Sequence, residues 1–187
     1  MQITSFSIPD VKLFEPRRFG DDRGFFSEVY SKRAFEEAGL HFDWVQDNHA
    51  MSRDRFVLRG LHFQAPPFAQ AKLVRVTKGA ILDIAVDLRQ GSPTYGRHVS
   101  AFLSEEAWNQ LLVPVGFAHG YLTLEPQTEV LYKVDNYYAP QCEGGIAWDD
   151  PELEIIWPLE GADPILSDKD RQLPHLKDLE NPFRYER

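Results

Sequence analysis

Strand-like patterns of hydrophobic and polar residues fill the middle of the chain. Seven segments are rich in β-branched and aromatic residues and are separated by Pro, Gly and Ser. They are Arg55–Phe63, Ala71–Lys78, Ala80–Leu88, Gly96–Leu103, Trp108–Val113, Ala118–Leu124 and Thr128–Asn136. In Ala80–Leu88 every second residue is apolar, while Asp83 and Asp87 fall between them, so one face of this strand is apolar and the other is mixed. Short strands at this spacing predict a mainly β, antiparallel sandwich or jelly roll.

One segment carries the signals of a helix. Ser31 is suited to the N-cap and Gly39 to the C-terminal stop of a helix over Ser31–Gly39. The tail from Pro151 onward has five prolines among its 37 residues, which favours an irregular or short-helical segment wrapped over the strands. We therefore expect residues 1–187 to form a single domain with short peripheral helices.

Composition narrows the class of protein. A chain of 187 residues with 43% hydrophobic content can bury a sizeable core. The net charge of −9 and the pI of about 5.1 argue against a protein that coats nucleic acid or binds a membrane surface through basic residues. Cys142 is the only cysteine, so no internal disulfide can form. No signal-like or membrane-spanning segment is found, and we expect a cytoplasmic protein.

A histidine and a lysine on neighbouring apolar strands are the first candidates for chemistry. Lys72 shares the strand face of Val74 and Val76, so its ammonium group is directed towards a core. Burying an ammonium group without a partner is costly, and such a lysine is usually paired, placed at a cavity, or used on a ligand. His62 lies on the preceding strand.

The second histidine, His119, ends a Pro-x-Gly-x-x-His sequence that begins at Pro114 and is similar to the second motif of cupins. Cupins generally bind a transition metal through two histidines and a glutamate of the first motif together with this later histidine. Here Gln64 stands two residues after His62, where a second histidine would be needed. We therefore expect no metal, and another role for the histidines.

His62, Lys72 and Tyr132 together suggest proton transfer at carbon. Tyr132 shares the strand face of Val130 and Val134, so its hydroxyl also points inward, and it is the one inward-facing proton donor that the pattern identifies. Removing a proton next to a carbonyl requires a base, a cation to stabilise the enolate, and an acid to return the proton. Taken singly, each residue could equally be a core histidine, a lysine with a buried stem, or a buried tyrosine.

Several motifs in order, from about Phe19 to Pro174, resemble the dTDP-4-dehydrorhamnose 3,5-epimerase family. They are Gly24-Phe25-Phe26-Ser27-Glu28, Gln46-Asp47-Asn48-His49, Leu58-Arg59-Gly60-Leu61-His62-Phe63-Gln64, Lys72, Val113-Pro114-x-Gly116-Phe117-Ala118-His119-Gly120, Tyr132 and Leu166-Ser167-Asp168-Lys169-Asp170. The resemblance implies a cupin-type jelly roll that forms a homodimer and needs no cofactor. It implies action on dTDP-4-dehydro-6-deoxy-D-glucose on the way to dTDP-L-rhamnose.

The resemblance also implies roles for the catalytic candidates. His62 would be the base, Lys72 would stabilise the enolate oxygen at C4, and Tyr132 would deliver a proton from the opposite face. A carboxylate would orient His62. Spacing leaves Asp168 and Asp170 both open as this carboxylate, and we choose Asp170 because it falls in the Lys-Asp pair of the family.

Nucleotide binding is implied for a larger set of residues. Arg23 and Arg59 would hold the diphosphate, because guanidinium groups pair with phosphate oxygens in a bidentate way. Tyr138 would stack on thymine. The remaining residues expected at the substrate are Phe26, Glu28, Gln46, Asp47, Asn48, His119, Glu143 and Lys169. Arg59 and His62 have opposite strand parity, so a bulge or a site at the strand end is needed for both to reach one cavity.

Three alternatives stay open. The first is an enzyme that epimerises only C3, or a ketoisomerase acting on a related sugar nucleotide, and Tyr132 favours double epimerisation over these. The second is a metal-dependent cupin oxygenase, which Gln64 disfavours. The third is a non-catalytic sugar-binding cupin, which would have no need for a base, a cation and an acid together.

Overall fold

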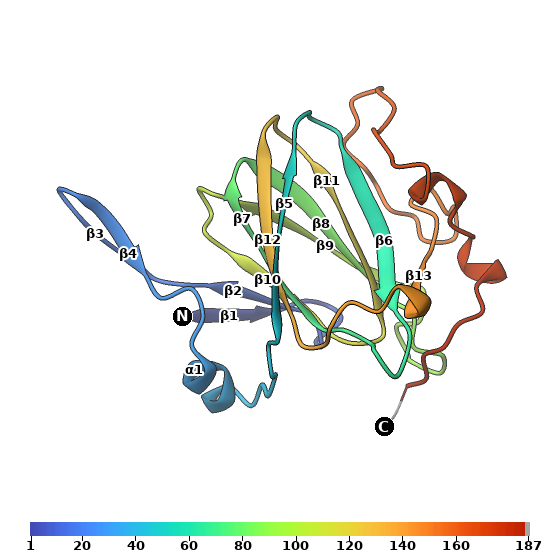
Figure 1. The fold of residues 1–187 in the computed structure, drawn as a ribbon, viewed down its shortest axis with the longest axis horizontal. Helices are drawn as coiled ribbons and strands as arrows, with labels where there is room; N and C mark the ends of the chain where they lie inside the picture. The colour runs from blue at the N-terminus through green and yellow to red at the C-terminus, as the bar shows by residue number, and fades with distance from the viewer. Residues whose placement is uncertain (186–187) are drawn as a thin grey trace.

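The computed structural model describes residues 1–185, and two antiparallel sheets face each other in it (Figure 1). The first sheet contains, in spatial order, β1 (Gln2–Ser5), β2 (Lys12–Glu15), β10 (Gln110–Val113), β7 (Lys72–Lys78), β12 (Thr128–Val134) and β5 (Gln46–Ser52). The second contains β13 (Glu143–Gly145), β6 (Leu58–Gln64), β11 (Phe117–Thr123), β8 (Ala80–Asp87) and β9 (His98–Ser104). The expected mainly β, antiparallel jelly roll is confirmed.

All seven strands expected from the sequence are present, with ends displaced by at most three residues. The pattern missed the polar edge strand β5. Its inward residues face a cavity and its outward residues face solvent, so neither side carries the apolar signal of a core strand. The short strands β1, β2 and β13 and the hairpin of β3 (Arg18–Asp21) and β4 (Gly24–Ser27) were missed as well.

The hydrophobic core has two main parts, one on each face of the second sheet. Ile81 and Ala85 of β8 pack between the sheets against Val74 and Val76 of β7. The alternate residues of β8, among them Ile84, pack under the C-terminal tail. The mixed face of β8 therefore points between the sheets and places Asp83 there, which decides the chemistry of the interior.

The expected helix is present as α1 (Lys32–Glu37). Ser31 occupies the N-cap position with extended backbone, but its side chain makes no capping hydrogen bond. Gly39 adopts a φ of +75°, the left-handed conformation that ends helices, so its predicted role is confirmed. Phe35 is the buried residue of α1 and stacks on Phe14, with ring centroids 4.6 Å apart, which holds the helix against the first sheet.

Two peripheral segments complete the fold. The β3–β4 hairpin projects from the side of the sandwich (Figure 1), and its base is fixed by a hydrogen bond from Trp108 Nε1 to Ser27 Oγ of 2.9 Å. The tail wraps the second sheet as expected, and its helical parts are the 3₁₀ turns η2 (Asp170–Gln172) and η3 (Leu176–Asp178); a third turn, η1 (Pro140–Cys142), precedes β13. Among the described residues, no helix has the length and apolar character needed to cross a membrane.

Candidate active site

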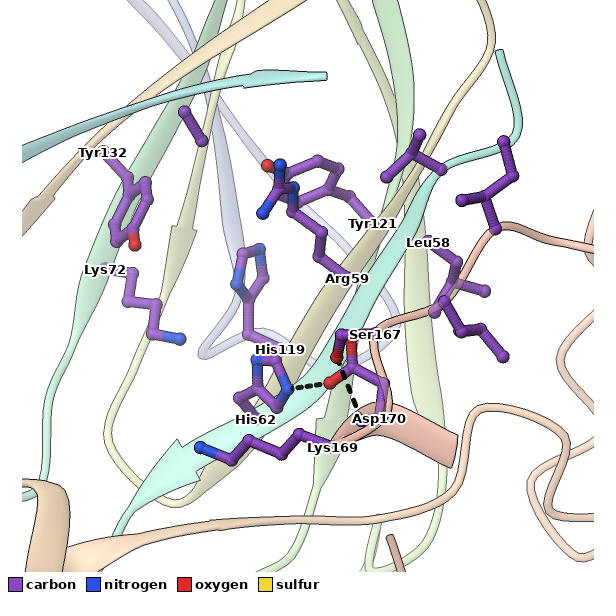
Figure 2. A pocket seen from close by; sticks show the side chains of 14 residues that line it. Leu58, Arg59, His62, Lys72, His119, Tyr121, Tyr132, Ser167, Lys169 and Asp170 are labelled. Atoms are coloured by element: carbon purple, nitrogen blue, oxygen red, sulfur yellow. Dashed lines mark hydrogen bonds and ion pairs between the residues drawn. The ribbon is translucent and has the colours of Figure 1, made fainter. Parts of the chain in front are cut away.

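A cavity between the two sheets brings the catalytic candidates together. It has two adjoining parts, of about 420 Å³ and 250 Å³, and His62, Lys72 and Tyr132 line both of them. We call the larger part the Arg59 chamber; its other lining residues are Ala50, Val57, Leu58, Arg59, His119, Tyr121, Ile165, Leu166, Ser167, Lys169 and Asp170 (Figure 2). We call the smaller part the Tyr138 chamber; its other lining residues are Gln46, Asn48, Phe63, Gln64, Gln70, Tyr138 and Glu143.

A β-bulge in β6 lets Arg59 and His62 share this cavity. His62 is paired with His119 of β11, and Arg59 is paired with Tyr121, with a register shift between them. Gly60 makes the bulge possible: its φ is +117°, and a Cβ at this position would lie 2.7 Å from the Gly120 Cα. The parity conflict seen in the sequence is therefore resolved by a bulge, one of the two solutions expected.

His62 is hydrogen-bonded to Asp170, with 2.5 Å between Nε2 and Oδ1. Asp170 is buried at the start of η2, and its backbone N–H donates to Ser167 Oγ. Burial raises the pKa of Asp170, but the hydrogen bond to His62 and the other contacts outweigh this, so the pKa is lowered overall. Asp168 is exposed and is not the partner of His62. Of the two acids that spacing left open, Asp170 is the one beside the imidazole.

Lys72 and Tyr132 reach the cavity from the sheet opposite His62. Lys72 begins β7, and Tyr132 lies on the neighbouring strand β12 (Figure 2). Burial lowers the pKa of Lys72 to about 8, although the charges of Asp83 and Glu143 oppose the shift. Burial raises the pKa of Tyr132, so its phenol stays protonated as a donor. An imidazole on one sheet and a phenol and an ammonium group on the other therefore line the same cavity.

A second histidine–aspartate pair lies behind this constellation. His119 Nε2 and Asp83 Oδ1 are 2.6 Å apart, and the side chain of Asp83 is 0% exposed. The other carboxylate oxygen of Asp83 has no hydrogen-bond partner in residues 1–185. Sequence reasoning placed Asp83 on a mixed face but did not assign it to the site. Because its charge supports the protonated form of Lys72, we assign it to the electrostatics of the site.

The charge state of Lys72 leads to a prediction for the pH profile. If the ammonium form acts on the substrate, kcat/KM has an alkaline limb, on which it falls as the pH rises through the pKa of about 8. Asp83→Asn removes a charge that raises this pKa, so the alkaline limb should move to lower pH. The measurement is kcat/KM between pH 6 and 9.5, with Asp43→Asn at an exposed surface pair as the control. An unmoved limb in Asp83→Asn would contradict the assignment.

Most of the residues expected at the nucleotide line the two chambers. Arg59, His119 and Lys169 line the Arg59 chamber, and Gln46, Asn48, Tyr138 and Glu143 line the Tyr138 chamber. Glu143 Oε2 accepts from the Tyr138 hydroxyl at 2.8 Å and lies 2.5 Å from Lys169 Nζ. Burial raises the pKa of Glu143, but these two contacts outweigh it, so the pKa is lowered and the carboxylate stays ionised.

Asp47 departs from the expected placement. Along β5 the side chains alternate, so Gln46 and Asn48 face the cavity while Asp47 faces outward and pairs with Lys133 at 2.8 Å. The Asp47 side chain therefore does not line this cavity, and the expected contact of Asp47 with the substrate stays a prediction. The strand period of two accounts for the difference.

Arg23, Phe26 and Glu28 also lie outside the cavity of their own chain. Arg23 sits at the tip of the projecting hairpin, where it is 90% exposed and pairs with Asp21 at 2.6 Å. Phe26 is 69% exposed on β4, and Glu28 follows that strand. Sequence order gave no sign that this hairpin turns away from the sandwich. A single chain does not bring these three residues to His62.

Gln64, which the sequence singled out as a missing metal ligand, has a structural role. Its amide nitrogen donates to the carbonyl oxygens of Phe68 and Tyr137, and its oxygen accepts from the N–H of Ala139. These bonds fix the chain beside Tyr138 and shape its chamber. Within residues 1–185, no group of three or more His, Cys, Asp or Glu side chains is arranged to hold a metal ion.

Comparisons with known proteins agree with this geometry. A family model described as dTDP-4-dehydrorhamnose 3,5-epimerase matches residues 5–178. The dTDP-4-dehydrorhamnose 3,5-epimerase of Pseudomonas aeruginosa is 57% identical over 173 residues, which are 92% of this chain and 94% of that protein. The dTDP-6-deoxy-D-glucose-3,5-epimerase of Legionella pneumophila, solved with dTDP-4-keto-L-rhamnose, is 41% identical with a TM-score of 0.95, covering 100% of this chain and 99% of that one.

A more distant solved structure is a 3′-monoepimerase from Streptomyces bikiniensis in complex with dTDP-quinovose. It is 34% identical with a TM-score of 0.87, covering 92% of this chain and 87% of that one. The same scaffold therefore occurs in an enzyme named for a single epimerisation. The family match over most of the chain, and the identity to relatives named for both epimerisations, show that this chain belongs to the dTDP-4-dehydrorhamnose 3,5-epimerase family.

Proposed function

We propose that this chain epimerises dTDP-4-dehydro-6-deoxy-D-glucose at C3 and C5, giving dTDP-4-dehydro-L-rhamnose for dTDP-L-rhamnose synthesis. The observation that carries the proposal is the placement of the His62–Asp170 pair and Tyr132 on opposite sheets, across one cavity. Inversion at carbon requires a base on one face and an acid on the other. The proposal needs no cofactor, and it keeps the cytoplasmic location expected from the sequence.

Each epimerisation follows the same sequence of proton transfers. His62 removes the proton from C3 or C5, and the electrons of the broken C–H bond move into the C4 carbonyl to form an enolate. The Lys72 ammonium group stabilises the enolate oxygen, and Asp170 stabilises the imidazolium. Tyr132 then donates its phenolic proton to the opposite face of the carbon. His62 is left with one extra proton and Tyr132 with one too few, and exchange with solvent restores both.

The nucleotide would be held along the two chambers. Arg59 supplies the cation for the diphosphate, and Lys169 supplies a further cation in the same chamber, which His119 also lines. Tyr138 offers an exposed ring on which thymine can stack, with Gln46, Asn48 and Glu143 around it for polar contacts. Ligand binding would have to replace the contacts that Glu143 now makes with Lys169 and Tyr138.

We further propose a homodimer in which the hairpin of each subunit completes the site of the other. The hairpin exposes three phenylalanines, Phe19, Phe25 and Phe26, and it carries Arg23 away from its own cavity. Exposed aromatic rings on a projecting element are typical of a surface that is buried on association. Arg23 of the partner subunit would then reach the diphosphate, with Phe26 and Glu28 of the partner subunit at the nucleoside.

A mixed dimer tests this arrangement. Arg23→Ala and His62→Ala homodimers should each be impaired, Arg23→Ala by at least about tenfold in kcat/KM because a charged contact to phosphate is lost. In a heterodimer of the two variants, one site has both defects and the other has neither. We expect about half of the parent activity in heterodimers purified through two different tags. A heterodimer no more active than the two variant homodimers would show that the hairpin acts within its own chain or has no role.

Product analysis tests the function itself. Incubation with dTDP-4-dehydro-6-deoxy-D-glucose in the presence of a chelator should give a product inverted at both C3 and C5 by NMR. Inversion at C3 alone would support the second candidate function, that of a C3 epimerase. The similarity of this fold to that of the 3′-monoepimerase is the observation that favours this candidate. Loss of activity in the chelator would support a metal-dependent enzyme, and absence of any product would support a binding protein.

A further inference from the structure

A second tyrosine, Tyr121, faces the cavity and has no role in the chemistry described above. It lies on β11 and is 4% exposed, with its ring in the core between the sheets. It lines the Arg59 chamber, and its hydroxyl is not one of the fully buried side-chain atoms of residues 1–185 that lack a hydrogen-bond partner, so it opens into the cavity. A hydroxyl in this position can donate to a bound ligand, and a phenylalanine would fill the same space without this donor. The hydroxyl is therefore placed to contact the ligand.

Arg59 is the neighbour that indicates what this ligand is. The bulge in β6 pairs Arg59 directly with Tyr121, and both side chains line the same chamber (Figure 2). Arg59 donates to Ser52 Oγ and to the carbonyl oxygen of Met51, both at 3.3 Å, which ties the guanidinium to the end of β5. Burial raises the pKa of Tyr121, and the Arg59 charge opposes the shift only in part, so the phenol remains a donor.

The charges of the chamber favour an anionic ligand at this pair. The lining includes three cationic side chains, Arg59, Lys72 and Lys169. Among the lining residues in the described part of the chain, the only acidic side chain is Asp170, which is engaged with His62. A neutral donor next to an arginine, in a chamber with no free carboxylate among its lining residues, is suited to a phosphoryl oxygen.

Tyr121 is not placed to act as a second proton donor for inversion. It comes from β11, which is the direct neighbour of β6 in the second sheet. His62 comes from β6, so both residues approach the cavity from the same sheet, whereas Tyr132 approaches from the other. A proton from Tyr121 would arrive on the side from which His62 removes one.

We propose that the Tyr121 hydroxyl donates a hydrogen bond to a non-bridging oxygen of the substrate diphosphate, the same group that Arg59 binds. The inference rests on the proposed function and adds to it a binding residue that sequence analysis did not assign. In this arrangement Arg59 supplies the charge and Tyr121 fixes the position of the phosphoryl group relative to His62 and Tyr132. Tyr121 is a binding residue, so its loss should weaken the binding of substrate and leave the proton transfers intact.

Tyr121→Phe tests the inference because it keeps the ring in the core and removes only the hydroxyl. Inhibition constants are measured for dTDP, inorganic pyrophosphate and thymidine, together with kcat and KM. We expect dTDP and pyrophosphate to bind about tenfold more weakly and KM to rise about tenfold. Thymidine binding and kcat should stay within about twofold of the parent. Tyr30→Phe, a partly buried tyrosine in the separate cluster around Phe35, is the matched control and should change none of these values.

Three results would overturn the inference. Unchanged dTDP and pyrophosphate binding in Tyr121→Phe would show that the hydroxyl touches no phosphate. A fall in kcat with unchanged KM would assign Tyr121 to proton transfer. If thymidine and pyrophosphate both bound more weakly by the same factor, the substitution would have disturbed the cavity in general. Weaker pyrophosphate binding together with a lowered melting temperature would lead to the same conclusion. If the parent protein bound no dTDP, both the proposed function and the inference would fail. If the parent bound dTDP and Tyr121→Phe bound it with the same affinity, only the inference would fail.

Discussion

His62→Ala should lower turnover by a factor of about 10² to 10⁴, the usual contribution of a general base. In the proposed mechanism the imidazole accepts the proton from the substrate carbon, and Asp170 is hydrogen-bonded to it. Affinity for dTDP should stay close to that of the parent, because the diphosphate and thymine contacts proposed here lie elsewhere in the two chambers. Steady-state kinetics and dTDP titration measure the two quantities separately.

The aspartates provide the controls for this prediction. Asp170→Asn should reduce turnover in the same direction as His62→Ala, since an amide cannot stabilise the imidazolium. Asp168→Asn should have little effect, because Asp168 is exposed and does not contact His62. If Asp168→Asn were the more damaging change, or if His62→Ala abolished dTDP binding, the assignment of His62 and Asp170 as the base and its partner would be wrong.

Tyr132→Phe should separate proton removal from inversion. The ring packs against the core between the sheets, so its retention should leave stability nearly unchanged. His62 can still remove a proton and return it to the same face, but no donor remains on the opposite sheet among the groups assigned here. Net epimerisation should therefore fall by about 10² or more, while exchange of the substrate hydrogens with solvent persists.

The readout is the ratio of hydrogen exchange to inversion, followed by NMR on the same sample. Parent enzyme should show inversion accompanying exchange at each carbon, and Tyr132→Phe should show exchange without inversion. Tyr121→Phe serves as the comparison, since it removes a cavity hydroxyl on the His62 side and should keep the parent ratio. Parent-like inversion in Tyr132→Phe would make Tyr132 a core tyrosine and would place the acid elsewhere.

The sequence was informative where side chains alternate regularly. Val74 and Val76 of β7 lie in the core between the sheets, and Lys72 on the same strand lines the cavity. Tyr132 packs against the same core. The alternation of side chains along a strand predicted both of these inward directions. Asp83 was recognisable only as an acid on a mixed face. Its position behind His119 depends on how β8 and β11 pair. Such long-range pairing cannot be predicted from the sequence of either strand alone.

Other parts of the site could not be predicted, because the local sequence pattern does not indicate which way their side chains point. Every residue of β11 is buried, so no alternation of apolar and polar positions indicates that Tyr121 faces the cavity. Arg59 required a bulge whose presence depends on Gly60 lying against Gly120 of a distant strand. The direction of the hairpin that carries Arg23 is set by contacts of Phe25 and Ser27 with Trp108, far along the chain.

The central claim is that one base, acting next to the C4 ketone, deprotonates both C3 and C5. Incubation of the parent enzyme with dTDP-4-dehydro-6-deoxy-D-glucose in deuterated water tests it directly, with deuterium located by NMR and counted by mass spectrometry. The account predicts deuterium at both C3 and C5, inversion at both carbons, and loss of deuterium uptake at both in His62→Ala. Inversion without deuterium uptake, or uptake at both carbons that survives in His62→Ala, would contradict it.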